Sequence, residues 1–236
     1  MQRYFAKARK DNLFVLDDKD LHHIKNVMRM KDDDCVEIIY ENELYLGKIY
    51  YSDKVNVAHL NKIETELHNN IPKVTLIIPI LKENKMDLIL QKSTELGVDS
   101  IIPIITERTV VKVENKEVKK IERWQRICKE ASEQSKRLTI PNIENIKRID
   151  DLKNISDLKI VCSTTKSCPN FKNFLQTHRN YDRIFIVIGP EGGLSSIEEQ
   201  KLNSLGFESI SLGENILRVE TVPLSVLSMI NYEYME

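Results

Sequence analysis

The stretch Ile186-Val-Ile-Gly-Pro-Glu-Gly-Gly-Leu-Ser-Ser-Ile-Glu-Glu199 joins an apolar run to a polar segment through three glycines and a proline. The apolar run predicts a buried strand, and Ser195 with Glu198 three residues later is the capping box of a following helix. Glycines at the C-terminal end of a strand let the backbone approach a ligand closely, and ligands of parallel α/β sheets bind at that edge. A plain strand-to-helix turn is the alternative, but one glycine would be enough for it, so we expect a ligand loop.

The sequence on both sides of this loop alternates between strand and helix patterns. A long amphipathic helix is predicted at 117–138, where apolar residues recur every three or four positions. Such alternation favours a mainly parallel sheet covered on both faces. The other predicted elements are strands at 74–80, 98–105, 159–162, 183–188 and 208–212, and a helix at 85–96 that Gly97 ends.

The first 63 residues have a different, β-rich pattern. Strands are predicted at 35–40, 44–51 and 55–63, with a short helix at 20–29. Seven of the 15 aromatic residues fall in the first 51 positions. They would suit a surface that stacks on bases, but we favour core and cross-strand pairs of a small barrel, because aromatic residues prefer strands. The polar run 64–73 is the best candidate for a linker.

Composition narrows the class of protein. The 236 residues carry 35 Lys and Arg against 36 Asp and Glu, and no apolar run approaches the ~18–20 residues of a membrane span. We expect no secretory signal, no disulfide scaffold and no metal site, because the N-terminus lacks a long apolar stretch and the four cysteines lack ligand spacing. These features predict a cytoplasmic enzyme with reduced thiols.

The ligand of the glycine loop is not a typical nucleotide. Neither GxGxxG nor GxxxxGK[ST] occurs, and Glu191 inside the loop disfavours a phosphate at that point. A neutral or cationic ligand bound through the backbone fits better. A second loop, at 211–224, contains Gly213 and an irregular stretch with Arg218 and Glu220. Taken alone, Arg218 suits a surface ion pair as well as a catalytic role.

Several spaced motifs resemble the RsmE family of ribosomal RNA uridine methyltransferases, which are of the SPOUT class. They are the glycine loop with the Leu-Ser that follows it, Leu212-Gly213, Ile216-Leu-Arg-Val-Glu-Thr221 and Lys92-Ser-Thr-Glu-Leu-Gly-Val98. Weaker support comes from 107–112, from Trp124 with 130–135, and from Arg3-Tyr-Phe. The chain departs from the family at Asn215, where an arginine is common, and at Val222, where alanine is common.

The resemblance implies an α/β fold with two domains. A PUA-like β-barrel that binds RNA would occupy residues 1–70, and a trefoil-knotted, parallel-sheet methyltransferase domain would occupy 73–236. The cofactor would be S-adenosyl-L-methionine and the product N3-methyluridine in 16S rRNA. The partners would be 16S rRNA or the small ribosomal subunit, and a second copy of the chain in a homodimer. A same-fold ribose 2′-O-methyltransferase and a non-catalytic RNA-binding assembly factor are the alternatives.

The resemblance also assigns the cofactor to the backbone around six residues: Ser163, Gly189, Gly193, Leu212, Gly213 and Leu217. We expect Arg218 to stabilise the negative charge of the uridine imide, and Glu220 to orient Arg218 or accept the proton. Secondary candidates for the active site are Glu95, Arg108 and Arg137. From the distribution of basic residues we expect RNA contacts by Arg3, Arg9, His23, Arg29, Arg123 and Arg126.

Overall fold

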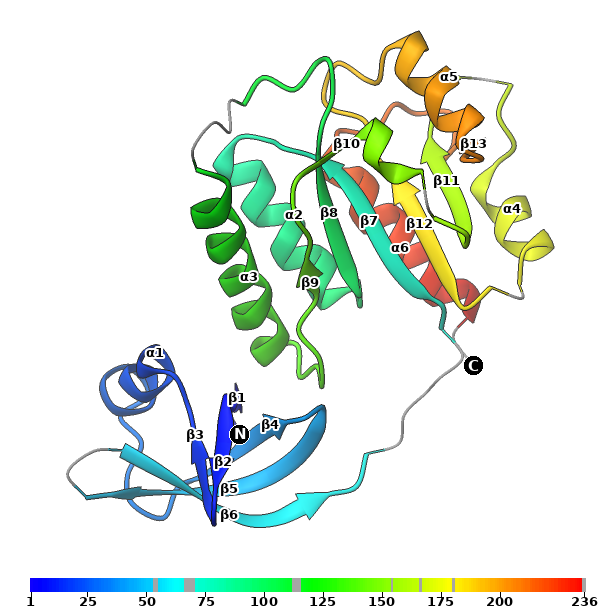
Figure 1. The fold of residues 1–236 in the computed structure, drawn as a ribbon. Coiled ribbons are helices and arrows are strands. Elements are labelled where there is room, and N and C mark those ends of the chain that lie inside the picture. Colours follow the sequence, from blue (N-terminus) through cyan, green and yellow to red (C-terminus); the bar gives the residue numbers. More distant parts are fainter. Residues whose placement is uncertain are drawn as a thin grey trace. The chain divides into compact units, whose positions relative to one another are not determined.

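The computed structural model describes residues 1–52, 55–65, 71–111, 116–153, 155–165, 167–179 and 181–234. Its contacts divide the chain into two compact units (Figure 1). The N-terminal unit is Met1–Leu67 with Lys129–Ile140, and the C-terminal unit is His68–Cys128 with Pro141–Glu236. A segment from the middle of the chain thus belongs to the N-terminal unit. Residues 66–70 of the expected linker lie outside the described part.

The N-terminal unit is built on a six-stranded sheet in the order β1-β4-β5-β6-β3-β2. All neighbouring strands are antiparallel except β1 and β4. The expected strands at 35–40 and 55–63 are confirmed, and the strand expected at 44–51 begins one residue earlier. The strands are β1 (Arg3–Phe5), β2 (Ala8–Lys10), β3 (Leu13–Val15), β4 (Cys35–Tyr40), β5 (Glu43–Tyr51) and β6 (Val55–Ile63).

The early aromatic residues mostly form core contacts, as the strand interpretation predicted. Tyr4, Phe14 and Tyr45 are buried in one cluster with aliphatic side chains of the sheet, and none of the seven is classed as exposed. The helix expected at 20–29 begins and ends two residues earlier, because α1 (Asp18–His22) continues as one π-helical turn, η1 (His23–Val27). The Asp17 side chain caps α1 by accepting a hydrogen bond from the Asp20 backbone N–H at 2.9 Å.

The C-terminal unit contains the predicted parallel sheet. Among the described residues it has seven strands in the order β10-β8-β7-β12-β11-β13, with β9 also beside β8, and every pairing is parallel. Short β9 and β10 were not anticipated. The strands are β7 (Lys73–Pro79), β8 (Ser100–Ile105), β9 (Asn142–Ile143), β10 (Lys147–Arg148), β11 (Leu158–Cys162), β12 (Arg183–Val187) and β13 (Glu208–Ile210).

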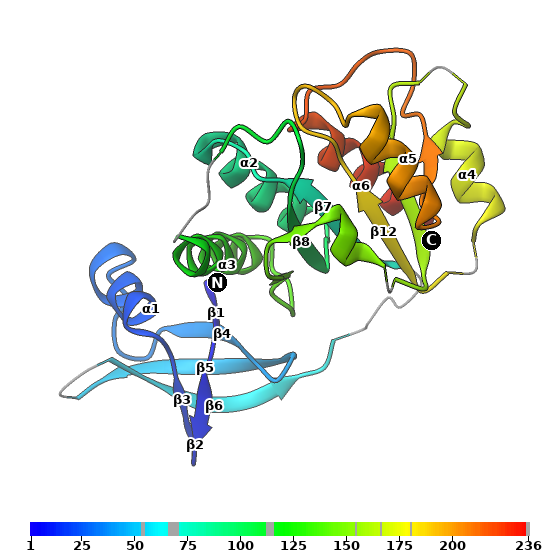
Figure 2. The same ribbon diagram turned by 45° about the horizontal axis from the view of Figure 1, so that its top comes forward.

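Helices cover both faces of this sheet, with α2 and α6 behind it and α5 in front of it in the two views (Figures 1 and 2). On the α5 side, the 3-10 turn η2 and the residues around Phe207 complete a core with Ile77, Ile102, Val161 and Val187. The helical elements are α2 (Glu83–Glu95), α3 (Glu117–Gln134), η2 (Ile149–Leu152), α4 (Phe171–Thr177), α5 (Ser196–Ser204) and α6 (Thr221–Tyr234). None of the described helices combines the length and apolar character that crossing a membrane requires.

Helix α3 ends at Gln134, four residues before its apolar periodicity does. Lys136 takes a left-handed conformation with φ +60°, and the Arg137 N–H donates back to Ser132 O at 3.0 Å. This six-to-one hydrogen bond is that of a Schellman motif, which ends a helix even where the left-handed residue is not glycine. The prediction that the helix reaches Leu138 was therefore wrong, because a local C-cap ends it.

Candidate functional site

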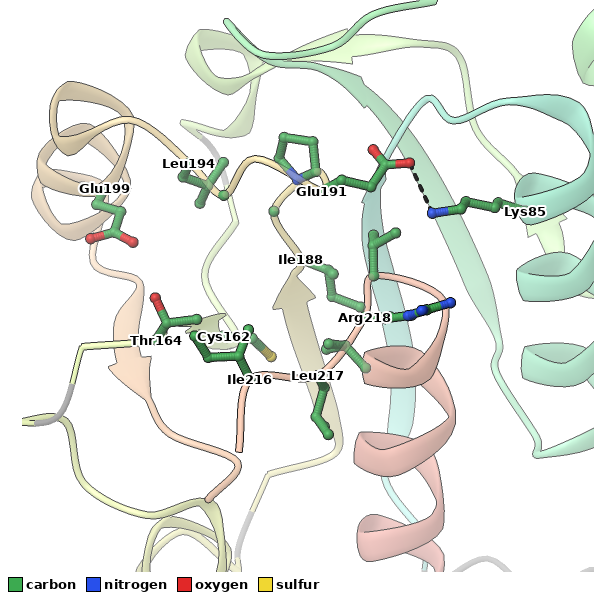
Figure 3. Close-up of a pocket in the computed structure, with 15 residues that line it drawn as sticks. Lys85, Cys162, Thr164, Ile188, Glu191, Leu194, Glu199, Ile216, Leu217 and Arg218 are labelled. Carbon is green, nitrogen blue, oxygen red and sulfur yellow. Dashed lines mark hydrogen bonds and ion pairs between the residues drawn. The ribbon is translucent and has the colours of Figure 1, made fainter. Parts of the chain in front are cut away.

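The loops that follow three neighbouring strands meet at one edge of the C-terminal unit. Because β11, β12 and β13 are parallel, the segments after Cys162, Val187 and Ile210 leave the sheet on the same side. They line a cavity of about 390 Å³ and an adjoining groove of about 1050 Å³ (Figure 3). Residues from 188–194 line the first and residues from 211–215 line the second, and both share Cys162, Thr164, Ile216, Leu217 and Val222.

The glycine loop is a tight turn that requires its glycines. Gly193 has φ +73° and donates its N–H to Pro190 O at 2.8 Å. A Cβ on Gly189 would lie 3.1 Å from the Leu194 nitrogen, so a side chain there would force the loop open. The expected capping box is confirmed: Ser195 N–H donates to Glu198 Oε2 at 2.9 Å, and Glu198 N–H donates to Ser195 Oγ at 3.3 Å.

The loop after β8 is joined to the glycine loop and to the start of α5 by hydrogen bonds. The Arg108 guanidinium donates to Gly192 O, and the Glu107 N–H donates to Glu198 Oε1 at 2.8 Å. Among the secondary candidates, Arg108 is thus brought to the site. Glu95 instead pairs with Lys92 on the surface of α2, and neither Glu95 nor Arg137 lines either cavity.

All six residues expected around the cofactor line the two cavities. Gly189 and Gly193 line the smaller cavity, Leu217 lines both, and Ser163, Leu212 and Gly213 line the groove. Gly213 has φ +133°, which favours glycine, and its N–H donates to Ser211 Oγ at 3.3 Å. The Ser163 N–H donates to Ile210 O at 2.9 Å, which joins the first loop to the third.

The charge of the groove matches the predicted type of ligand. Among the described residues that line the groove, Glu214 is the one ionisable side chain other than cysteine, and none is a lysine or arginine. Backbone groups, small polar side chains and apolar side chains form the rest of this described wall. A neutral or positively charged ligand suits such a surface better than an isolated phosphate, because a phosphate needs a cation to offset the loss of its hydration.

The charged residues of the site gather at the smaller cavity. The Lys85 ammonium, in the first turn of α2, lies 3.2 Å from Glu191 Oε1 and 3.3 Å from Glu220 Oε2. Figure 3 shows Lys85 reaching toward Glu191, with Arg218 on the same side of the cavity. Arg218 is exposed, and its guanidinium makes no hydrogen bond or ion pair with any residue that the structure describes.

Glu220 is held as a carboxylate. Its own backbone N–H and the Lys85 ammonium lower the pKa of Glu220, with a further contribution from the Arg218 charge. A carboxylate with a lowered pKa is a poor proton acceptor at neutral pH. The ion pair with Lys85 at 3.3 Å places Glu220 where it can orient the charges of the site, which is one of the two roles expected for it.

Cys162 lines both cavities, yet it is unsuited to nucleophilic chemistry. Burial raises the pKa of its thiol to about 12, so the thiol stays protonated at neutral pH. Across the described residues, no group of three His, Cys, Asp or Glu side chains is placed to hold a metal ion.

The residues expected to contact RNA are in unequal positions. Arg3 is buried, pairs with Glu37 at 2.9 Å and donates to Lys136 O, so it serves the packing of the N-terminal unit and we remove it from the RNA surface. Arg123 is committed to a bidentate pair with Asp87. The His23 ring is half-buried and hydrogen-bonded to the Tyr4 hydroxyl at 2.9 Å.

Three of the expected RNA-binding arginines remain exposed: Arg9, Arg29 and Arg126. Arg9 lies 5.8 Å above the Phe14 ring and 5.9 Å above the Tyr45 ring, which holds its guanidinium at the surface of the sheet.

Sequence reasoning missed Lys85, because its partner Glu191 lies 106 positions away and no local pattern marks the lysine.

Comparison with known proteins agrees with this geometry. The protein-family model described as an RNA methyltransferase domain matches residues 68–231, and the one described as an RNA methyltransferase PUA domain matches residues 16–54. A protein of Mesomycoplasma hyopneumoniae named Ribosomal RNA small subunit methyltransferase E is 34% identical over 97% of this chain and 98% of its own. The protein of that name from Bacillus subtilis is also 34% identical, over 99% of this chain and 97% of its own.

Two solved structures have the same fold over almost the whole chain. A putative methyltransferase of Legionella pneumophila, in complex with bound SAM, gives a TM-score of 0.90 at 27% identity, covering 99% of this chain and 98% of its own. A Ribosomal RNA small subunit methyltransferase E of Neisseria gonorrhoeae, bound to S-adenosyl methionine, gives 0.84 at 28% identity with the same coverage. With its parallel sheet, its two converging loops and these relatives, the chain belongs to the RsmE family of RNA methyltransferases.

Proposed function

We propose that the protein transfers a methyl group from S-adenosyl-L-methionine to N3 of a uridine in 16S rRNA. One observation carries the proposal: the two glycine-containing loops converge on adjoining cavities, with an unpaired Arg218 at their edge. Relatives that share the fold and the family are named for this rRNA, and two of them are described with the cofactor bound.

The lining residues fit the cofactor. When bound, S-adenosyl-L-methionine supplies an electrophilic methyl group on a positively charged sulfur. Gly189, Gly193 and Gly213 leave main-chain groups accessible, and Leu217 lines both cavities. Among its described lining residues the groove has no cation that would oppose a sulfonium, and the smaller cavity is lined by Glu191 and Glu199 as well as by Lys85 and Arg218. The sequence alone predicted a neutral or cationic ligand.

The uridine requires the protein to stabilise a negative charge on the base. N3 carries a proton at neutral pH and lies on the Watson–Crick edge, so the base must be unpaired before a methyl donor can reach it. Loss of that proton to solvent water spreads negative charge over the imide. A fixed cation beside the imide lowers the cost of that charge. Arg218 is suited to this role because its guanidinium has no described partner and lines the cavity.

The proposal extends to the partners. The N-terminal unit, part of which matches a PUA domain, would bind RNA with Arg9 and Arg29 among its contacts. The substrate would be 16S rRNA, free or in the small ribosomal subunit, which implies a cytoplasmic location. Exposed apolar side chains on α2 and α6 support a homodimer through these helices. They are Leu88, Met229 and Tyr232.

The direct test replaces Arg218 with alanine. We expect methyl transfer to small-subunit rRNA to fall by a factor of about 10²–10³ or more, because one preorganised donor to a developing anion is worth that much. Cofactor affinity measured by calorimetry should stay within a few-fold. Nuclease digestion with mass spectrometry of the nucleosides identifies the product.

Each other outcome reassigns a part of the site. Loss of cofactor binding in the variant would make Arg218 part of the cofactor pocket. A methylated ribose in the wild-type product would replace the proposed reaction with 2′-O-methylation. An absence of cofactor binding by the wild-type protein would leave an RNA-binding assembly factor.

A further inference from the structure

Lys85 is the one residue that contacts both carboxylates near Arg218 in the described structure. It projects from the first turn of α2, and its ammonium lies 3.2 Å from Glu191 and 3.3 Å from Glu220. These carboxylates come from different loops, one after β12 and one before α6. Lys85 therefore joins three segments at the cavity wall, and both carboxylates raise the pKa of its ammonium.

The same two carboxylates are natural partners for Arg218. Glu220 is two positions from Arg218, and the arginine charge already lowers the pKa of Glu220. Glu191 lines the same cavity as Arg218. A guanidinium pairs with carboxylates in a bidentate geometry that an ammonium cannot match, so an unoccupied carboxylate here would attract it. An arginine held in such a pair would have fewer donors left for a substrate.

We propose that Lys85 is a positioning residue that occupies Glu191 and Glu220, and thereby keeps the Arg218 guanidinium unpaired for the uridine imide. The inference rests on the proposed function for the identity of the substrate. The availability of Arg218 is a property of the free protein and is measurable without any reaction.

The geometry explains why a lysine serves this purpose. Its compact ammonium reaches one oxygen of each carboxylate and leaves the planar fork of Arg218 free. Glu220 Oε2 is buried, and the Lys85 ammonium lies 3.3 Å from it, so loss of Lys85 would leave this oxygen without that cation and favour its pairing with Arg218. Lys85 thus occupies the two carboxylates that would otherwise compete with the substrate for the Arg218 guanidinium.

Labelling with phenylglyoxal, read at Arg218 by peptide mass spectrometry, tests the inference on the full-length protein. We expect Lys85→Met to slow the labelling of Arg218 by about twofold to fivefold, the range for pairing with an exposed carboxylate. The triple variant Lys85→Met, Glu191→Gln, Glu220→Gln should restore the wild-type rate. Lys92→Met is the matched control, because Lys92 pairs with Glu95 on the same helix and lines neither cavity.

Two results would overturn the inference. One is unchanged labelling of Arg218 in Lys85→Met. The other is slowed labelling that the triple variant does not restore, which would indicate a general disturbance of the loops. In the Lys92→Met control, Arg218 must be labelled at the wild-type rate for the result to be assigned to Lys85.

Steady-state kinetics separate this role from a direct contact with RNA. Lys85→Met should lower kcat by a factor similar to that of the labelling, leave the KM for RNA within twofold, and be rescued by Lys85→Arg. A salt-dependent rise in KM with unchanged kcat and unchanged labelling would make Lys85 a phosphate contact and refute the inference. If the wild-type protein methylated no RNA, the proposed function would fail, while the labelling would still decide the role of Lys85.

Discussion

Each unit of the molecule contains a lysine shared by several carboxylates, and the two clusters differ in burial. In the N-terminal unit, the Lys129 ammonium lies 2.8 Å from Asp17, 2.6 Å from Asp20 and 3.3 Å from Glu133. All four side chains are 20% exposed or less. Burial raises the pKa of both Asp20 and Glu133.

The C-terminal cluster is open to water. Lys85 and Glu191 are 36% and 45% exposed, and only Glu220 is largely covered, at 17%. Solvent screens such pairs, so their contribution to folding is small. A lysine shared by carboxylates thus contributes to folding in the buried Lys129 cluster, where water is excluded. In the open Lys85 cluster, where water enters, it sets the charge of a site instead.

Three mutations test this contrast, from the largest expected effect to the smallest.

Lys129→Met should cost about 3–5 kcal/mol of unfolding free energy, because it leaves buried carboxylates without a cation. Asp20 and Glu133 would take up protons to avoid the full penalty, and the loss should therefore be larger at pH 8 than at pH 5. Chemical denaturation measures the free energy of unfolding, and hydrogen exchange of the β4 and β5 amides shows that the change arises in this unit. Lys129→Arg keeps the charge and serves as the control; a loss below about 1 kcal/mol for the methionine variant would contradict the buried-cluster interpretation.

Glu133→Gln should change how stability depends on pH. Burial raises the pKa of Glu133 from an ordinary 4.5 to about 7, so the folded state binds this proton more tightly than the unfolded state. Its stabilising contribution is full below about pH 4.5 and is lost as the pH rises through about 7. The variant does not titrate here and should gain up to about 3 kcal/mol relative to wild type between pH 4.5 and pH 8.

The difference in unfolding free energy between Glu133→Gln and wild type, measured across that pH range, isolates this group from the other acids. A difference that stays constant with pH would show that folding does not shift the pKa of Glu133. Glu130→Gln removes a carboxylate at an exposed position on the same helix and is the matched control.

Lys85→Met should have the smallest effect on stability, below about 1 kcal/mol and declining with added salt. Thermal unfolding at low and high ionic strength measures it beside Lys129→Met. A loss as large as that of Lys129→Met would mean that the open cluster is structural, and the contrast between the two units would disappear.

Local sequence determined the elements that build the site. The capping box of Ser195 and Glu198, the helix end at Gly97 (φ +94°) and the strand before Gly189 depend on residues close in the chain, and all are confirmed. Parallel topology followed from the alternation of strands and helices. Two converging loops with glycines at their turns were therefore predictable, because φ preferences and short-range hydrogen bonds are properties of the local chain.

Only the tertiary structure decided which charges meet. Lys85 and Glu191 are 106 positions apart, and Lys129 and Asp17 are 112 positions apart. The sequence marked Arg3 as a basic residue near the N-terminus, but the fold buried it against Glu37. Burial and ion pairing depend on the surroundings that distant segments create after folding. The same type of side chain can therefore be an exposed cation at one position and a buried ion-pair partner at another. The guanidinium of Arg218, which has no partner among the residues that the structure describes, is such a product of the fold.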